Sequence, residues 1–282
     1  MSGGYVNKSK NKKQHYISAF HLYHFTNDNQ KSLVKERRKT KIYHFDIRKN
    51  KINERPIEQL ATESYLFSFQ DGSGVYNYDL DEKLKATEDN AAKSFDYMAG
   101  LYDEIVTNRR ASIEINNSHI DSLIEFISWQ WKRDPELIAN VEKEIIEKTS
   151  IFEGRTIEAA LRVIEQSGTC DKYNVLEVLN NKSFVFLMIA NDVDEFVVTD
   201  KPFVRFNPNG MDGIAFDDTE IYYPITSKIM LVMLNSSTDR MVDMIQDSSQ
   251  INELNKYNAR QAYKYVFASN ASVLEKLVHE IS

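Results

Sequence analysis

The feature that most constrains the fold is a long stretch of helical periodicity near the middle of the chain. From about Asp79, apolar residues recur at helical spacing for six or seven turns; they are Leu84, Ala91, Phe95, Met98, Tyr102 and Ile105. A second stripe follows at Ile120, Leu123, Ile124, Ile127 and Trp131. Because this spacing puts one apolar face on each segment, we expect two amphipathic helices that pack on a common core.

The flanking segments have the composition of strands. Aromatic and β-branched runs at 41–47, 182–191, 195–206 and 221–235 are separated by turn-forming residues. We expect further helices over 136–148, 156–167 and 249–267 and from there to Ile281, and a strand or extended segment over 15–25. This order predicts an α+β fold, with a mixed or antiparallel sheet packed against a central group of long helices. We expect one compact domain over 14–282 behind a flexible basic tail, 1–13.

The charge of the chain is unevenly distributed. The net charge is -7, but residues 1–51 hold 13 Lys or Arg against three acids, so this segment is +10 and the remainder is -17. Four of the six histidines lie in the same segment. The asymmetry predicts that the basic end contacts a polyanion such as nucleic acid. The alternative is that the basic end folds back onto the acidic remainder.

Other features exclude several classes of protein. The single cysteine, Cys170, excludes an intramolecular disulfide framework. The first twenty residues lack the apolar core of a secretory signal, and the longest apolar run, 184–190, is too short to cross a bilayer. The scattered glycines argue against a Walker or Rossmann nucleotide site. We therefore expect a cytoplasmic protein with no membrane contact.

Several polar residues lie where the pattern predicts burial. Glu88 shares the apolar face of the first long helix, and Asn255 that of the predicted 249–267 helix. Gln130 and Arg133 flank the aromatic stripe of the second helix, and Asp200 follows an apolar run directly before Lys201 and Pro202. A buried charge needs a partner or a proton. These residues are therefore either a functional set or structural hydrogen-bonding groups, with Arg133 paired to Glu88 in the structural interpretation.

Seven stretches, in order, resemble those of the family called domain of unknown function 4238. They are "QHYISAFHLYHFT", "KIYHFD" with "LDEKLKATEDNAAKSFDYM", "FISWQWKRDPEL", "FVVTDKPF", "IYYPITSKIMLVML" and "INELNKYNARQAYKYVFAS", spanning about residues 14–269. The chain departs from the family pattern at Gln14, Ser18, Val198 and Lys201. The resemblance implies one α+β domain whose polar landmarks meet in one cleft. By position, these landmarks are His15, Glu82, Glu88, Gln130, Arg133, Asp200, Pro202 and Asn255.

The first functional hypothesis is a nuclease or other phosphodiester hydrolase, in the role of a toxin or phage-defence effector. His15 would act as general acid or base, Glu88 and Asp200 would hold a Mg2+ ion or a water, and Arg133 would bind the developing negative charge. Glu82, Gln130 and Asn255 would support them. The residues expected to contact phosphates are Lys12, Lys13, Arg37, Arg38, Lys39 and Lys41.

The second hypothesis is a non-catalytic binding module for protein or nucleic acid, in which the polar set is a buried structural network. A third is a sensor of a small molecule or nucleotide signal. Solvent access discriminates the first two hypotheses, because catalytic residues need an open cleft, whereas a structural network is sealed and mutually satisfied.

Overall fold

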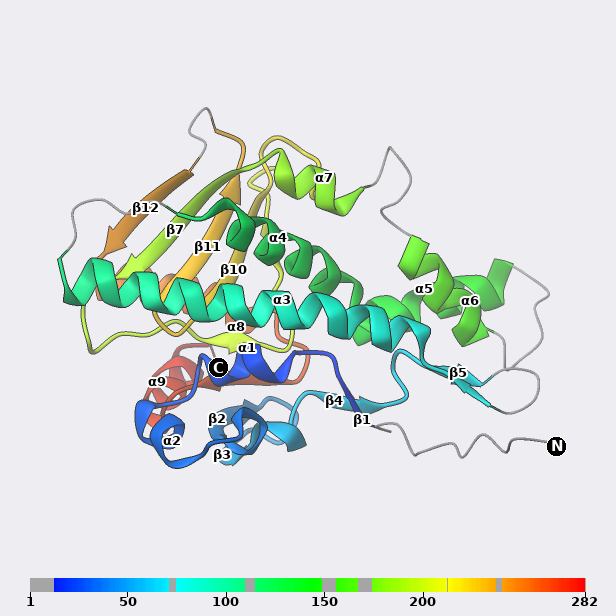
Figure 1. Cartoon of the computed structure of the whole chain (residues 1–282), viewed down its shortest axis with the longest axis horizontal. Coiled ribbons are helices and arrows are strands. Elements are labelled where there is room, and N and C mark those ends of the chain that lie inside the picture. Colours follow the sequence, from blue (N-terminus) through cyan, green and yellow to red (C-terminus); the bar gives the residue numbers. More distant parts are fainter. Residues whose placement is uncertain are drawn as a thin grey trace.

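Two β-sheets and a pair of long crossing helices organise the chain (Figure 1). The computed structural model describes residues 13–70, 75–109, 115–148, 156–166, 174–211, 213–236 and 240–281. The helices are α1 (Ala19–Tyr23), α2 (Asp28–Leu33), η1 (Arg37–Lys39), η2 (Ile57–Gln59), α3 (Asp79–Tyr102), the π-helical turn η3 (Asp103–Thr107), α4 (Asn117–Lys132), α5 (Pro135–Lys148), α6 (Thr156–Gln166), α7 (Val175–Asn180), α8 (Ser248–Arg260) and α9 (Ala271–Ile281). The strands are β1 (Lys13–His15), β2 (Lys41–Asp46), β3 (Lys51–Pro56), β4 (Thr62–Ser64), β5 (Phe69–Gln70), β6 (Tyr76–Asn77), β7 (Ser183–Ile189), β8 (Val198–Thr199), β9 (Val204–Phe206), β10 (Glu220–Thr226), β11 (Ile229–Leu234), β12 (Arg240–Ile245) and β13 (Tyr265–Ala268).

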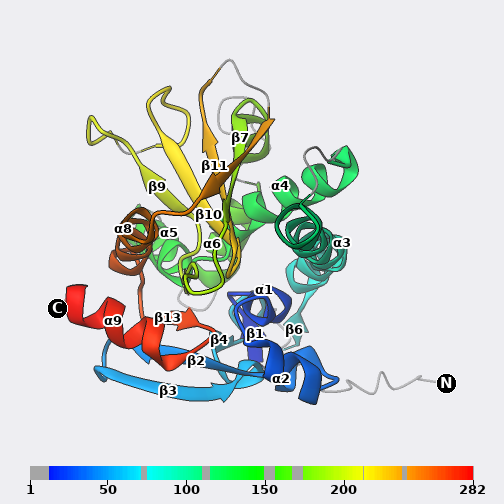
Figure 2. The same cartoon turned by 90° about the vertical axis from the view of Figure 1, so that its left-hand side faces the viewer.

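The larger sheet has five strands in the order β12-β7-β11-β10-β9. Strand β12 runs parallel to β7, and the other neighbours are antiparallel. Side chains alternate between the two faces of a strand, and on one face Phe186, Tyr223 and Leu231 are fully buried with Phe95 of α3 and Phe126 of α4. Helices α3 and α4 therefore cover this face, whereas α8 lies on the opposite side (Figure 2).

The smaller sheet has four strands in the order β3-β2-β13-β8. Its central pair joins distant parts of the chain, because β13 is antiparallel to β2 on one side and to β8 on the other. The buried side chains of Phe45, Val266 and Ala268 pack with Leu274 and Leu277 of α9. Helix α9 thus covers this sheet at the lower end of the molecule (Figure 2).

The segment at the start of the described chain runs into the centre of the molecule. Strand β1 pairs with β4, and α1 follows directly. His21 of α1 is fully buried among aromatic rings, where its Nε2 lies 2.7 Å from the carbonyl oxygen of Pro224 and its ring stacks on Tyr223. His21 is therefore a core residue.

Two element predictions are wrong. The extended segment expected over 15–25 contains the short helix α1, because aromatic residues at 20, 21 and 25 pack into the core on one side of a helical turn. The helix expected over 249–267 ends at Arg260, because the aromatic run 265–268 is pulled into the smaller sheet as β13. Helix α4 begins after Asn116, whose side chain accepts from the N–H of Ser118.

The predicted fold class is confirmed as a single compact α+β domain. The predicted sheet is divided into the five-stranded and four-stranded sheets and two further two-stranded ones, and the long helices cover one face of the largest. Residues 1–12 of the predicted tail lie outside the described residues, and Lys13 already belongs to β1. Within the described part of the chain, no helix has both the length and the hydropathy needed to cross a bilayer.

Candidate functional site

The segment Gln14–Ser18 carries the site and is fixed by its own buried amide. Gln14 is almost fully buried; its Nε2 donates to Ser68 Oγ over 2.7 Å, and its Oε1 accepts from the backbone N–H of Phe67 over 2.7 Å. The amide of Gln14 therefore holds the segment against residues 67 and 68. One cavity lies on each side of this segment in space, and the predicted site residues are divided between the two cavities.

On one side, Ser18, Glu88 and Arg133 form a closed triangle of charge-assisted hydrogen bonds. Arg133 Nη1 donates to Glu88 Oε1 and to Ser18 Oγ, each over 2.6 Å, and Ser18 Oγ donates to the same Glu88 oxygen over 2.6 Å. Burial opposes ionisation of Glu88, but the Arg133 guanidinium and these hydrogen bonds outweigh it, so the pKa of Glu88 lies below its ordinary value. The predicted structural pairing of Arg133 with Glu88 is thus present.

His15 lies beside this triangle at the end of β1. It lines a cavity of about 40 Å³ together with Lys13, Arg38, Glu88 and Arg133, enough space for about three water molecules. Among the described residues, His15 Nε2 and Arg133 Nε are buried without a hydrogen-bond partner. Burial, and next the cation of Arg38, lower the pKa of His15 to about 4. The imidazole is therefore neutral near pH 7.

Two exposed cations stand around this cavity. The described residues form no ion pair with Lys13 or Arg38, whereas the third exposed cation of the lining, Lys85, is paired with Asp81 over 2.5 Å. Cationic side chains beside the buried, unpartnered Nε–H of Arg133 are the kind of donors that oxyanions prefer. We refer to the cavity and its lining as the His15 cavity.

Asp200 and Gln130 lie on the other side of the segment. They line a separate cavity of about 170 Å³ together with Lys201 and Pro202. Gln130 Nε2 donates to the carbonyl oxygen of Tyr16 over 2.7 Å, so it holds the backbone next to His15. Gln130 therefore supports the segment from behind.

The carboxylate of Asp200 is occupied by backbone donors. It accepts N–H bonds from Tyr263 (2.8 Å), Lys264 (2.7 Å) and Tyr265 (3.0 Å), where the chain leaves α8 and enters β13. Burial raises the pKa of Asp200 to about 6, and the three N–H bonds offset part of that effect. Asp200 is therefore a structural clasp between a helix end and a strand.

This geometry contradicts the predicted metal site of Glu88 and Asp200. The two carboxylates line different cavities, Glu88 is paired with Arg133, and Asp200 is bonded to three amides. No group of three or more His, Cys, Asp or Glu suited to a metal ion occurs within the described ranges. These residues do not fit a shared Mg2+ ion, and the single cleft implied by the family resemblance is divided into two.

Two of the predicted supporting residues lie elsewhere. Asn255 Oδ1 accepts from the N–H of Val197 over 2.9 Å, and its Nδ2 donates to the carbonyl oxygen of Glu195 over 2.8 Å. It therefore ties α8 to the segment before β8. Glu82 is exposed in the first turn of α3 and is not part of the His15 cavity.

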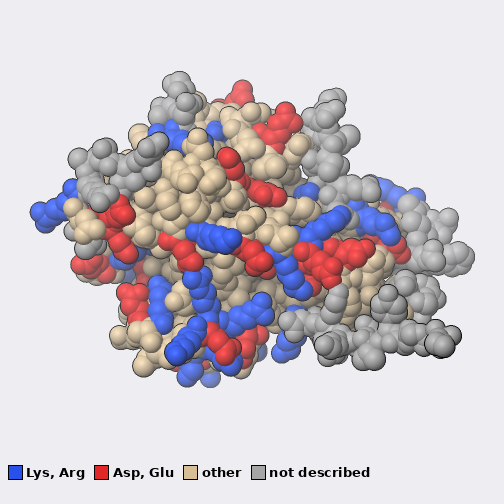
Figure 3. Space-filling view, in the orientation of Figure 1, with Lys and Arg blue, Asp and Glu red and all other residues tan. Residues whose placement is uncertain are grey.

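The predicted phosphate-contacting residues also divide. Arg37 is paired with Asp96 of α3 over 2.8 Å, and Lys39 with Glu36 over 2.9 Å. Lys41 is exposed at the start of β2, and Lys12 lies outside the described residues. Figure 3 shows Lys and Arg gathered on the lower part of this face with acids among them. Of these two ion pairs, Arg37–Asp96 connects the basic end to the acidic remainder, whereas Lys39–Glu36 lies within the basic end itself.

The sequence interpretation missed Ser18, which it treated only as a departure from the family pattern. Its position directly before a short apolar run is typical of a helix N-cap, and it is the N-terminal flanking residue of α1. Its hydroxyl bonds Glu88 and Arg133 instead of the helix. Only the tertiary structure reveals that partner.

Comparison with curated proteins and with solved structures gave no match. The sequence model of one family, described as protein of unknown function (DUF4238), matches residues 13–272, which include both cavities and every landmark described above. The match covers nearly the whole chain, and the chain therefore belongs to the DUF4238 family.

Proposed function

We propose that the protein binds nucleic acid by holding a phosphate group at the His15 cavity. One observation carries the proposal: Lys13 and Arg38, which form no ion pair among the described residues, meet there with the buried, unpartnered Nε–H of Arg133. A phosphate oxygen accepts hydrogen bonds from these donors, and the unpartnered Nε2 of the neutral His15 lies beside them. The remaining basic residues of this region have intramolecular acid partners or lie outside the cavity, so we expect few phosphate contacts.

The Ser18–Glu88–Arg133 triangle supports this function by positioning the donors. Arg133 is 2% exposed, its Nη1 is already bonded, and its buried Nε has no hydrogen-bond partner among the described residues. A guanidinium held in this way loses little conformational freedom on binding an anion. The structural network and the binding site are therefore parts of one arrangement.

Hydrolysis of a phosphodiester is the second candidate, and the neutral imidazole of His15 favours it. A neutral imidazole can accept a proton from a ribose 2′-hydroxyl or a water, while Arg38 and Arg133 stabilise the charge that develops on the phosphate. In this scheme His15 takes the proton and no residue is assigned to a metal ion, so this candidate predicts cleavage of RNA that does not require Mg2+. The cellular role to test in that case is a toxin or phage-defence effector.

Binding is tested by fluorescence anisotropy with labelled 12-nucleotide single-stranded RNA and DNA at several salt concentrations. Arg38→Gln should weaken binding about 5–10-fold and lower the slope of log K against log salt by about 0.7, the value for one lost phosphate contact on a single strand. Lys39→Gln is the matched control, because it removes the same charge one residue away from a side chain already paired with Glu36. Equal effects of the two variants, or no binding by the wild type, would contradict the proposal.

Cleavage is tested with the same oligonucleotides, with Mg2+ and with EDTA, and with circular dichroism as a check of folding. The second candidate requires that wild-type protein cuts RNA in EDTA and that folded His15→Asn does not. Binding without cleavage leaves the binding proposal intact and removes the hydrolase.

A further inference from the structure

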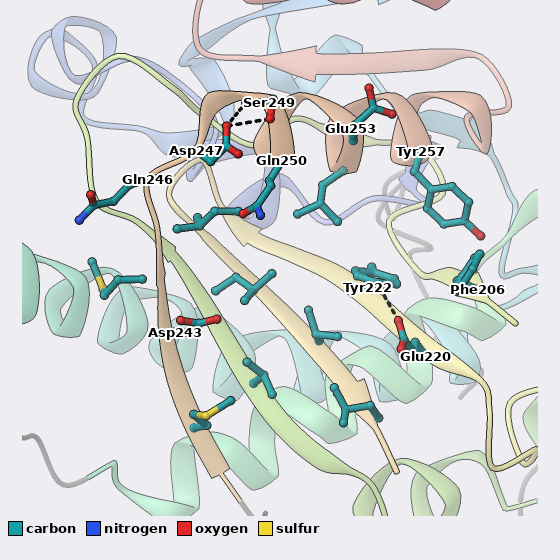
Figure 4. Close-up of a pocket in the computed structure, with 18 of the residues that line it drawn as sticks. Phe206, Glu220, Tyr222, Asp243, Gln246, Asp247, Ser249, Gln250, Glu253 and Tyr257 are labelled. Carbon is teal, nitrogen blue, oxygen red and sulfur yellow. Dashed lines mark hydrogen bonds between the residues drawn. The ribbon is translucent and has the colours of Figure 1, made fainter. Parts of the chain in front are cut away.

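A further large cavity lies on the face of the five-stranded sheet that α3 and α4 leave uncovered. Strands β7, β10, β11 and β12 form its floor, and α8 forms one wall (Figure 4). Its volume is about 1060 Å³, the upper size of sites that hold small organic molecules. We call it the sheet groove.

The floor of the sheet groove is apolar. Strand alternation brings Val185, Leu187, Tyr222, Val232 and Leu234 to this face, in register across three strands. Three large apolar side chains on its rim are well exposed: Met241 (46%), Phe206 (40%) and Met244 (37%). A face with this composition can bury the apolar body of a ligand.

The charge of the sheet groove is negative. Its lining holds four acids, Glu220, Asp243, Asp247 and Glu253, and one basic residue, Arg260. Two of the acids have intramolecular roles, because Asp247 caps α8 and Glu253 is paired with Lys256 over 2.8 Å. Glu220 and Asp243 have no basic partner among the described residues. Glu220 accepts a hydrogen bond from the hydroxyl of Tyr222, which orients its carboxylate within the groove (Figure 4).

Three aromatic rings stand beside Glu220. The centroids of Phe206 and Tyr257 are 5.7 Å apart with planes at 83°, and those of Tyr222 and Tyr257 are 6.2 Å apart at 68°. Phe206 is also the direct cross-strand partner of Glu220. Rings set nearly at right angles around a carboxylate offer both π-faces and a negative charge, which together attract an organic cation.

We propose that the sheet groove binds an organic cation with an apolar body. The cationic head lies against Tyr222, Tyr257 and Glu220, and the apolar body covers Val185 and Val232. Arg260, on the exposed last turn of α8, is the one basic side chain of the lining and would attract an anionic head, but four acids of the same lining oppose it. The proposal concerns a second site and does not depend on the function of the His15 cavity.

The test uses three probes with the same 4-phenylbutyl body and a trimethylammonium, a hydroxyl or a carboxylate head, measured by titration calorimetry. We expect the ammonium probe to bind at least about 10-fold more tightly than the alcohol, since a desolvated cation–π contact and a carboxylate together are worth that factor. Glu220→Gln should abolish the preference, whereas Glu54→Gln, the same change on the exposed side of β3, should not alter it.

Methionine methyl signals locate the binding. In protein labelled at methionine methyls, the ammonium probe should shift the signals of Met241 and Met244. The signal of Met98, a residue of α3 buried in the core on the other face of the sheet, should not change. Equal binding of the alcohol and ammonium probes would assign the groove to an uncharged ligand and overturn the proposal. No saturable binding, or shifts confined to other methionines, would overturn it as well.

Discussion

At the scale of single residues, some of the polar landmarks have their hydrogen bonds met by other side chains or by the backbone, and others line a cavity. Their burial was predictable, because Glu88 and Arg133 lie on or beside apolar stripes and a buried charge needs a partner. The separation of Asp200 from Glu88 was not predictable, because it depends on where the end of a strand lies relative to a helix in the folded chain. Side chains brought together by tertiary packing leave no local pattern in the sequence.

Asp200→Asn should lower the free energy of unfolding by about 2–3 kcal/mol. An amide has one acceptor oxygen, so its NH2 group would face backbone N–H donors that the carboxylate now satisfies. Urea denaturation at pH 7 measures the effect, and the exposed Asp89→Asn should change it by less than about 0.5 kcal/mol. A folded Asp200→Asn protein of normal stability would refute the clasp and return Asp200 to the catalytic candidates.

At the scale of elements, the strength of the local pattern decided which predictions succeeded. The stripes of α3 and α4 run for several turns and specify both helices. Helix α1 has only five residues, and β13 follows α8 with no glycine or proline between them, so neither has a local signal. The sheet groove was not predictable either, because both faces of β7 and β11 are apolar and the sequence does not show which one is covered.

Gly100→Ala should raise the free energy of unfolding by about 0.5–1 kcal/mol. Gly100 lies on the exposed side of α3, and a Cβ atom there would have no atom within 4 Å, so alanine gains helix propensity without a clash. Gly210→Ala is the contrasting variant. Its φ of +69° disfavours any side chain, so it should lower stability by about 1 kcal/mol. Thermal or urea unfolding measures whether the two variants change the free energy of unfolding in opposite directions. A destabilised Gly100→Ala protein would contradict the placement of Gly100 on the exposed side of α3.

At the scale of the whole molecule, the basic end and the acidic body are partly joined. The Arg37–Asp96 ion pair connects η1 to α3, and His24 Nε2 lies 3.3 Å from the same carboxylate. These two contacts agree with the alternative that the basic end folds back onto the acidic remainder, which stays a prediction for the rest of that segment. The polyanion contact expected from the same asymmetry is narrowed to Lys13 and Arg38 and remains a proposal.

Stability should fall in acid. Burial is the main cause that lowers the pKa of His15 to about 4, that of His21 to about 3 and that of His44 to about 4. In the unfolded chain, the same histidines bind protons with pKa values of about 6.5. Their contribution to the free energy of unfolding is therefore fully present above about pH 6.5 and is lost as the pH falls toward 4. Asp200, whose pKa is raised, opposes part of this loss. We expect a net loss of at least about 2 kcal/mol between pH 7 and pH 4.5.

Urea denaturation at stepped pH measures this loss. His21→Gln keeps a donor for the Pro224 carbonyl but does not titrate, so its stability should depend less steeply on pH. His279→Gln, an exposed change in α9, should leave the slope unchanged. A wild-type curve that is flat between pH 4.5 and 7 would contradict the neutral buried histidines.

The position of β13 has a consequence for how the protein is made. Strand β2 is synthesised early, but its inner neighbour β13 lies more than two hundred residues later in the chain. While a ribosome is still adding the middle of the protein, β2 is therefore paired with β3 but lacks its second neighbour. The unpaired edge of β2 can associate with other chains. We expect nascent chains that stop before residue 265 to need a chaperone, and release of the full-length chain to end that need.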